Sequence, residues 1–81
     1  SQPQSQLFLQ VGAFGNKENA QEEAARFKHL ARIQIVSDAT RNPPLYKVRL
    51  GPFEEEEAAS RLQSQIERRF GIKPLMIWLD A

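Results

Sequence analysis

Few side chains in this sequence could take part in catalysis or metal binding, and they are scattered along the chain. The only histidine, His29, is expected on the exposed side of a helix, and there is no cysteine. The longest carboxylate run, Glu54 to Glu57, suits a helix N-terminus, where the helix dipole favours negative charge. No serine has an evident base partner. We therefore predict no enzyme activity, no metal site and no cofactor.

Length and composition predict one folded domain without a membrane segment. A chain of 81 residues has room for a single core, and a domain of this size buries only about 60% of its unfolded surface. Its longest apolar run is far shorter than the roughly 18 residues of a spanning helix. The polar residues 1–5 are expected to be a linker tail and residues 6–81 the domain, cut from a longer protein. We expect a monomer.

The sequence contains an internal duplication. Residues 9–14 recur as residues 48–53, and in each copy an apolar, strand-like run ends in a Gly-x-Phe corner. The two glycines, Gly12 and Gly51, lie 39 residues apart and are not spaced like those of a phosphate-binding loop. Each copy is therefore one supersecondary unit. The same offset pairs Leu7 with Tyr46, Ala20 with Ala59, Ile33 with Ile72 and Val36 with Leu75.

Each Gly-x-Phe corner is followed by a helical pattern. Apolar residues at helical spacing predict a first helix near residues 17–31, with Asn16 or Asn19 as its N-cap. The second helix is predicted to begin in the carboxylate run at residues 54–57. It is expected to stop at Gly71, because glycine readily ends a helix.

Two short apolar runs, residues 33–36 and 75–79, predict the remaining strands, and Pro43 and Pro44 separate the halves. The order βαββαβ is typical of an α+β, ferredoxin-like (RNP-like) fold, a four-stranded antiparallel sheet with two helices on one face. The first and third strands are expected in the centre and the others at the edges. The helix-free side, called the open face below, is then available to a ligand.

Alternation of side chains along each strand assigns residues to the two faces of the sheet. The residues expected to face the helices are Leu7, Leu9, Val11, Tyr46, Val48, Leu50, Leu75, Ile77 and Leu79. The residues expected on the open face are Phe8, Gln10, Gly12, Val36, Leu45, Lys47, Arg49, Met76 and Trp78. Large apolar groups rimmed by polar ones indicate a binding patch. The alternative is that Trp78 packs inward or against the loop between the halves.

Two segments of the chain resemble the SPOR domain, the sporulation-related repeat of bacterial envelope proteins. The segments are Leu9 to Phe14 and Tyr46 to Phe53, and the resemblance extends over residues 6–79. It implies binding, without cleavage, of peptidoglycan glycan strands that have lost their stem peptides. It further implies a place in the periplasm, at the division septum of the cell envelope, with any cleavage activity in a separate domain.

The resemblance also implies which residues hold the ligand. The family's first-strand glutamine corresponds to Gln10, and Leu45 stands where some members have an aromatic residue. Apart from the resemblance, the predicted position of Trp78 on the open face leads us to expect that it supplies the aromatic platform instead. The lactyl carboxylate of muramic acid, free once the stem peptide is gone, could pair with Arg49 or Lys47. The predicted ligand-binding residues are Phe8, Gln10, Gly12, Ala13, Phe14, Val36, Thr40, Leu45, Lys47, Arg49, Met76 and Trp78.

Two other functions fit the same topology. Single-stranded RNA also binds to aromatic residues on open sheets, but the basic-Gly-aromatic signature of such domains is absent. A net charge of +1 also gives little attraction to phosphates. A small-molecule regulatory domain or a protein-interaction module is the third possibility. The predicted partner is therefore the glycan, with neither nucleic acid nor membrane insertion.

Overall fold

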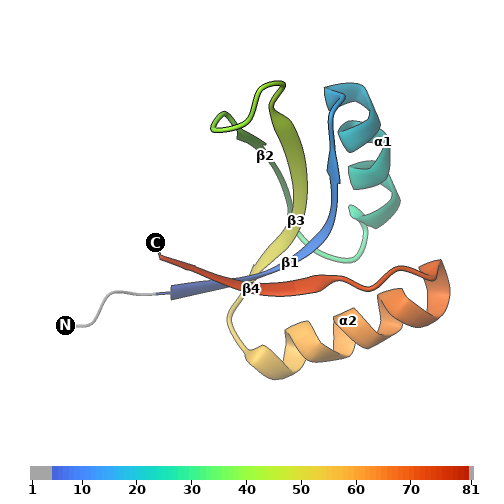
Figure 1. Ribbon diagram of the computed structural model, residues 1–81. Coiled ribbons are helices and arrows are strands. Elements are labelled where there is room, and N and C mark those ends of the chain that lie inside the picture. The colour runs from blue at the N-terminus through green and yellow to red at the C-terminus, as the bar shows by residue number, and fades with distance from the viewer. Residues whose placement is uncertain (1–4, 81) are drawn as a thin grey trace.

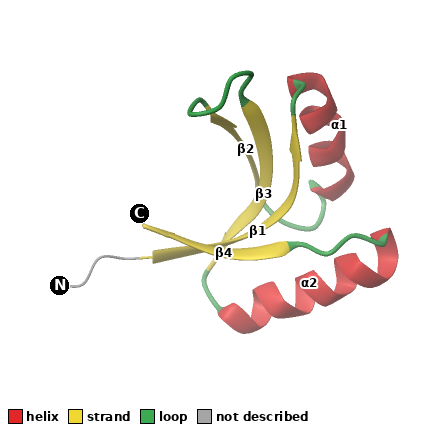
Figure 2. Ribbon diagram, viewed as in Figure 1, coloured by secondary structure: helices red, strands yellow, loops and turns green. Residues whose placement is uncertain are grey.

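The elements occur in the predicted βαββαβ order in the computed structural model, which describes residues 5–80. The strands pair antiparallel in the order β2-β3-β1-β4, with both helices against one face (Figure 1; Figure 2). The predicted fold class and the central placement of the first and third strands are therefore confirmed. The elements are β1 (Ser5–Phe14), α1 (Lys17–Phe27), β2 (Ile33–Asp38), β3 (Leu45–Phe53), α2 (Glu56–Phe70) and β4 (Leu75–Asp80).

Local chemistry explains both ends of α1. Of the two predicted N-caps, Asn16 is the one used: its side-chain oxygen accepts hydrogen bonds from the backbone N–H groups of Glu18 (2.7 Å) and Asn19 (3.2 Å). The helix ends at Phe27 rather than at residue 31. The backbone N–H of Leu30 instead donates to the carbonyl of Phe27 at 2.9 Å in a closing turn.

The second helix follows the expected pattern of charges and caps. Its first turn carries Glu56 and Glu57, and its last turn carries Arg68 and Arg69, so charge complements the helix dipole at both ends. Gly71 ends the helix with φ 71° and donates its N–H to Glu67 at 3.1 Å, as a left-handed C-cap does. Neither helix in the described part of the chain is long and apolar enough to cross a membrane.

The core lies between the sheet and the two helices. Leu7, Leu9 and Leu50 from the central strands pack with Phe27 of α1 and Ile66 of α2. A second cluster joins α1 to β3 around the buried Val48. These residues face the helices as the alternation predicted, because successive side chains of a strand point to opposite faces.

Two bulges bend the central strands. The β1–β3 register shifts between Leu7 and Leu9 and again between Gln10 and Gly12, and bulges increase local bend and twist. Figure 1 shows β1 and β3 bending together, with the helices outside the bend and the open face inside it. Gly51 makes one bulge possible: its φ is +125°, and a Cβ there would lie 2.9 Å from the carbonyl oxygen of Leu7.

The predicted linker of residues 1–5 falls largely outside the described residues. Its last member, Ser5, is the first residue of β1 and pairs with Asp80 of β4. The sheet therefore begins one residue earlier than the domain boundary expected from composition.

Candidate functional site

Strand pairing defines the open face, because residues that pair directly across an antiparallel ladder share a face. At its centre, Arg49 of β3 lies between Gln10 of β1 and Gln34 of β2. Two residues earlier on β3, Lys47 lies between Ala13 of β1 and Val36 of β2. The open face thus comprises Gln6, Phe8, Gln10, Ala13, Gln34, Val36, Asp38, Leu45, Lys47, Arg49, Leu75, Ile77 and Leu79.

Phe8 lies on the open face but not as an exposed platform. It pairs with Ile77 and belongs to neither cluster under the helices, yet it is only 3% exposed. The register shift between Leu7 and Leu9 places it where the sheet bends inward. The expectation of an accessible Phe8 is therefore wrong, and this ring forms the floor of the face.

Strict alternation fails along the second half of β1. The register shift after Gln10 reverses the faces that follow, because one additional residue in a strand moves every later side chain to the other side. Gly12 consequently pairs with the buried Val48, and Phe14 packs with the cluster around it. The expected open-face position of Gly12 is therefore wrong, and Phe14, predicted to bind ligand, belongs to the helix side.

The face assignment of β4 is inverted relative to the prediction. Met76 pairs with Leu9 and packs against the core, and Trp78 pairs with Leu7, so both lie on the helix side. Trp78 remains 55% exposed. In Figure 1 the end of β4 extends past the start of α2, which leaves this end of the sheet without a helix over it.

The open face also includes residues that were not expected there. On β4 these are Leu75, Ile77 and Leu79, and on β2 they are Gln34 and Asp38. One signal could have identified the first group: the 39-residue offset pairs Leu75 with Val36, which alternation had already placed on the open face. The apolar pattern of β4 could not have identified these residues, because both faces of this strand are apolar.

The charges at the β2 edge are partly neutralised. Asp38 lies 3.4 Å from the Lys47 ammonium and 3.8 Å from Arg41. The hydroxyl and the backbone N–H of Thr40 also donate to Asp38. The hydrogen bond from the Thr40 hydroxyl is the largest cause that lowers the pKa of the Asp38 carboxyl. The backbone hydrogen bond and Lys47 lower this pKa further. Thr40, predicted to bind ligand, is engaged here in holding Asp38.

Arg49 differs from Lys47 in its pairing with acidic side chains. Among the described residues it forms no salt bridge, and its Nε is inaccessible and without a hydrogen-bond partner. Buried polar groups are nearly always paired in native proteins. The guanidinium is therefore the cation of the open face that retains unused hydrogen-bonding capacity.

The lowered pKa of Asp38 predicts a titration. Because the folded-state pKa lies below the ordinary value of 3.8, the charged carboxylate stabilises the fold above that value, and this contribution is lost as the pH falls through the folded-state pKa. We expect the carboxyl carbon resonance of Asp38, followed by NMR, to titrate with a midpoint below 3.8. A midpoint at or above that value would contradict the hydrogen bonds from Thr40.

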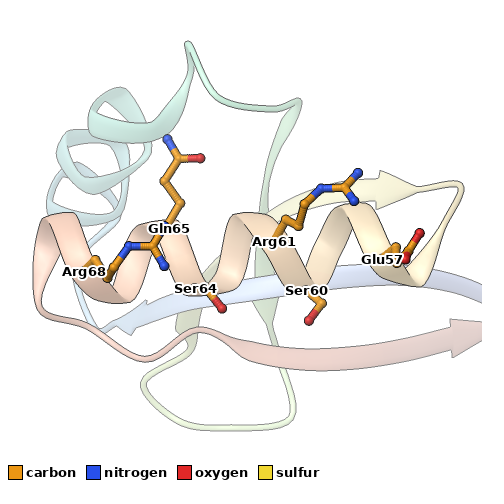
Figure 3. A pocket seen from close by; sticks show the side chains of 6 residues that line it. All are labelled: Glu57, Ser60, Arg61, Ser64, Gln65 and Arg68. Carbon is orange, nitrogen blue, oxygen red and sulfur yellow. The ribbon is translucent and has the colours of Figure 1, made fainter.

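Two surface hollows of the described residues lie away from the polar centre of the open face at Gln10, Arg49 and Lys47. One runs along the solvent side of α2, where Figure 3 shows all lining side chains rising from this single helix. Another lies near the start of β1 and includes Arg32 and Phe53. Neither is lined by a predicted ligand-binding residue. Small molecules favour concave pockets, and neither of these two hollows provides one at the predicted residues.

Comparison with known proteins gives consistent results. The family model of the SPOR domain matches residues 3–78. The crystal structure of the RlpA SPOR domain from Pseudomonas aeruginosa is similar, with a TM-score of 0.78 and 35% identity over 88% of this chain and 96% of that one. The solution structure of the peptidoglycan binding domain of the B. subtilis cell wall lytic enzyme CwlC shares the fold, with a TM-score of 0.69 and 23% identity over 96% and 94%. A search of curated proteins gave no significant match.

Proposed function

Because the chain belongs to the SPOR domain family, we propose that it is a non-catalytic module that binds bacterial peptidoglycan. Its ligand is the glycan strand without stem peptides, and the binding surface is the open face. In this role it directs a larger envelope protein to the division septum. The similar B. subtilis domain is described as peptidoglycan binding, which supports the polymer as partner.

The observation that carries this proposal is the environment of Arg49. In the strand pairing Arg49 lies between Gln10 and Gln34, and its guanidinium forms no salt bridge among the described residues. A guanidinium recognises a carboxylate through paired hydrogen bonds, and muramic acid exposes its lactyl carboxylate only when the stem peptide is absent. The flanking amides can donate to and accept from sugar hydroxyl and acetamido groups.

The apolar part of the open face suits the sugar rings themselves. Leu75 and Ile77 of β4 pair with Gln10 and Phe8, so an apolar strip runs beside the polar centre. Sugar rings have apolar C–H faces, which gain contact area on such a strip. Contact in this proposal is therefore aliphatic, since the aromatic Trp78 lies on the helix side.

The test is a calorimetric titration with synthetic glycan repeats that differ only in the stem peptide. We expect the repeat without peptide to bind more tightly by roughly 10- to 150-fold, the value of one hydrogen bond to a charged group. Steric exclusion of the peptide should add to this difference. Equal affinity for both repeats would refute the specificity for denuded glycan, and no binding to either would refute the glycan ligand.

A further inference from the structure

Three basic side chains lie close together on β3 and on the loop that leads into it. Arg49 and Lys47 are on the open face of β3, about 7 Å apart along the strand, and Arg41 lies in the loop between β2 and β3. A row of cations beside apolar side chains is the kind of surface that binds single-stranded nucleic acids. The open face therefore has the elements of a polyphosphate site as well as those of a glycan site.

Asp38 interrupts this row of cations. It ends β2, pairs with Leu45 on the open face, and its side chain is only 20% exposed. Its Oδ1 accepts hydrogen bonds from the backbone N–H and the hydroxyl of Thr40. Its Oδ2 lies 3.4 Å from the Lys47 ammonium and 3.8 Å from Nε of Arg41. Thr40 thus fixes a carboxylate whose other oxygen faces two of the three cations.

We propose that Asp38 is a specificity-determining residue, which keeps chains with a phosphate on every unit off the open face and leaves Arg49 to bind the glycan. A polyphosphate chain binds by having several of its charges neutralised at once, so it needs the whole row of cations. The stem-peptide-free glycan has one carboxylate in each disaccharide repeat, for which a single guanidinium suffices. Asp38 therefore weakens the first kind of binding more than the second. The identity of the accepted ligand rests on the proposed function.

Asp80 provides a matched comparison for Asp38. It also ends an edge strand, but it pairs with Ser5 at the opposite edge of the sheet. It forms no salt bridge within residues 5–80. Removal of its charge changes the net charge of the chain by the same amount as removal of the Asp38 charge, but it uncovers no cation.

The experiment measures binding of a fluorescein-labelled oligothymidylate, with linear polyphosphate as a competitor, at about 10 mM salt, where the screening length is about 30 Å. We expect Asp38→Asn to bind both probes about two- to thirty-fold more tightly than the wild type, because two ion pairs no longer occupy Lys47 and Arg41. The salt dependence of this binding should also steepen, since more counterions are released. The affinity for stem-peptide-free glycan, measured by calorimetry, should rise by a smaller factor.

Two further variants make the result specific. Asp80→Asn should bind the oligothymidylate like the wild type, and the double variant Asp38→Asn/Lys47→Gln should lose most of the gain. Circular dichroism should show Asp38→Asn folded, because asparagine keeps an oxygen that accepts from Thr40.

Four results would overturn this inference. They are no gain in phosphate binding for Asp38→Asn, an equal gain for Asp80→Asn, a gain in glycan affinity as large as the gain for the phosphate probes, and loss of folding in Asp38→Asn. Failure of the proposed function gives a different result. If neither protein binds glycan but Asp38→Asn gains phosphate binding, the glycan ligand is refuted, whereas the exclusion of phosphate chains by Asp38 is supported.

Discussion

Arg49→Gln is expected to weaken the binding of stem-peptide-free glycan by roughly 10- to 150-fold, the range for one hydrogen bond to a charged group. Glutamine keeps the start of the side chain and ends in a neutral amide, but it removes the only cation of the open face that forms no salt bridge among the described residues. Calorimetric titration measures the change. Thermal unfolding should show a folded variant, because Arg49 makes no salt bridge within residues 5–80 that the substitution would remove.

Two control variants make the Arg49 result specific. Arg61→Gln makes the same chemical change on the solvent side of α2 and should leave the affinity unaltered. Lys47→Gln should have a smaller effect than Arg49→Gln, because the Lys47 ammonium is already 3.4 Å from Asp38. Equal losses at Arg49 and Arg61 would indicate a general charge effect, and a larger loss at Lys47 would move the centre of the site toward β2.

Phe27→Ala is expected to remove about 3 to 5 kcal/mol from the free energy of unfolding. The ring is fully buried, packs with Leu7, Leu9 and Ile66, and meets the ring of Phe70 edge-on at 4.9 Å. Truncation leaves a cavity where the two helices meet the sheet. Since domains have only about 0.05 to 0.15 kcal/mol of stability per residue, this loss is a large fraction of the total for this small chain.

Urea denaturation of Phe27→Ala measures the loss, with Leu75→Ala as its control. Leu75 is 59% exposed, so its truncation should change stability by no more than about 0.5 kcal/mol. A cost below about 1 kcal/mol for Phe27→Ala would mean that the site collapses around the missing ring. A large cost for Leu75→Ala would contradict its exposed position.

The fold could be predicted because two independent signals agree for the central strands. Alternation places Leu7 and Leu9 toward the helices, and the duplication assigns Val48 and Leu50 to the same side, as the structure confirms. Alternation alone failed where a bulge intervened. Val11 is the additional residue at the register shift after Gln10. Nothing in the sequence marks it, because valine is an ordinary strand residue.

The open face could be predicted only in part. Gln10, Lys47 and Arg49 are on it as expected, because these polar residues alternate with apolar ones in central strands. Met76 and Trp78 do not lie on the open face. The strand β4 is apolar on both sides, so its pattern does not indicate which side faces the helices. The ion pair between Asp38 and Lys47 depends on the register of β2 against β3, which a single sequence does not specify.

The pairing of the first residue of β1 with the last residue of β4 has a mechanical consequence. Ser5 pairs with Asp80, with 3.5 Å between the hydroxyl and the carboxylate oxygen, so the start of β1 lies beside the end of β4 (Figure 1). A tension applied to these two residues pulls antiparallel neighbours apart from one end. The ladder hydrogen bonds then break one after another, each resisting with only about 0.5 to 1.5 kcal/mol, instead of bearing the load together as they would in shear. Loaded through its two ends, the domain unzips at low force, and β4 separates from the sheet first.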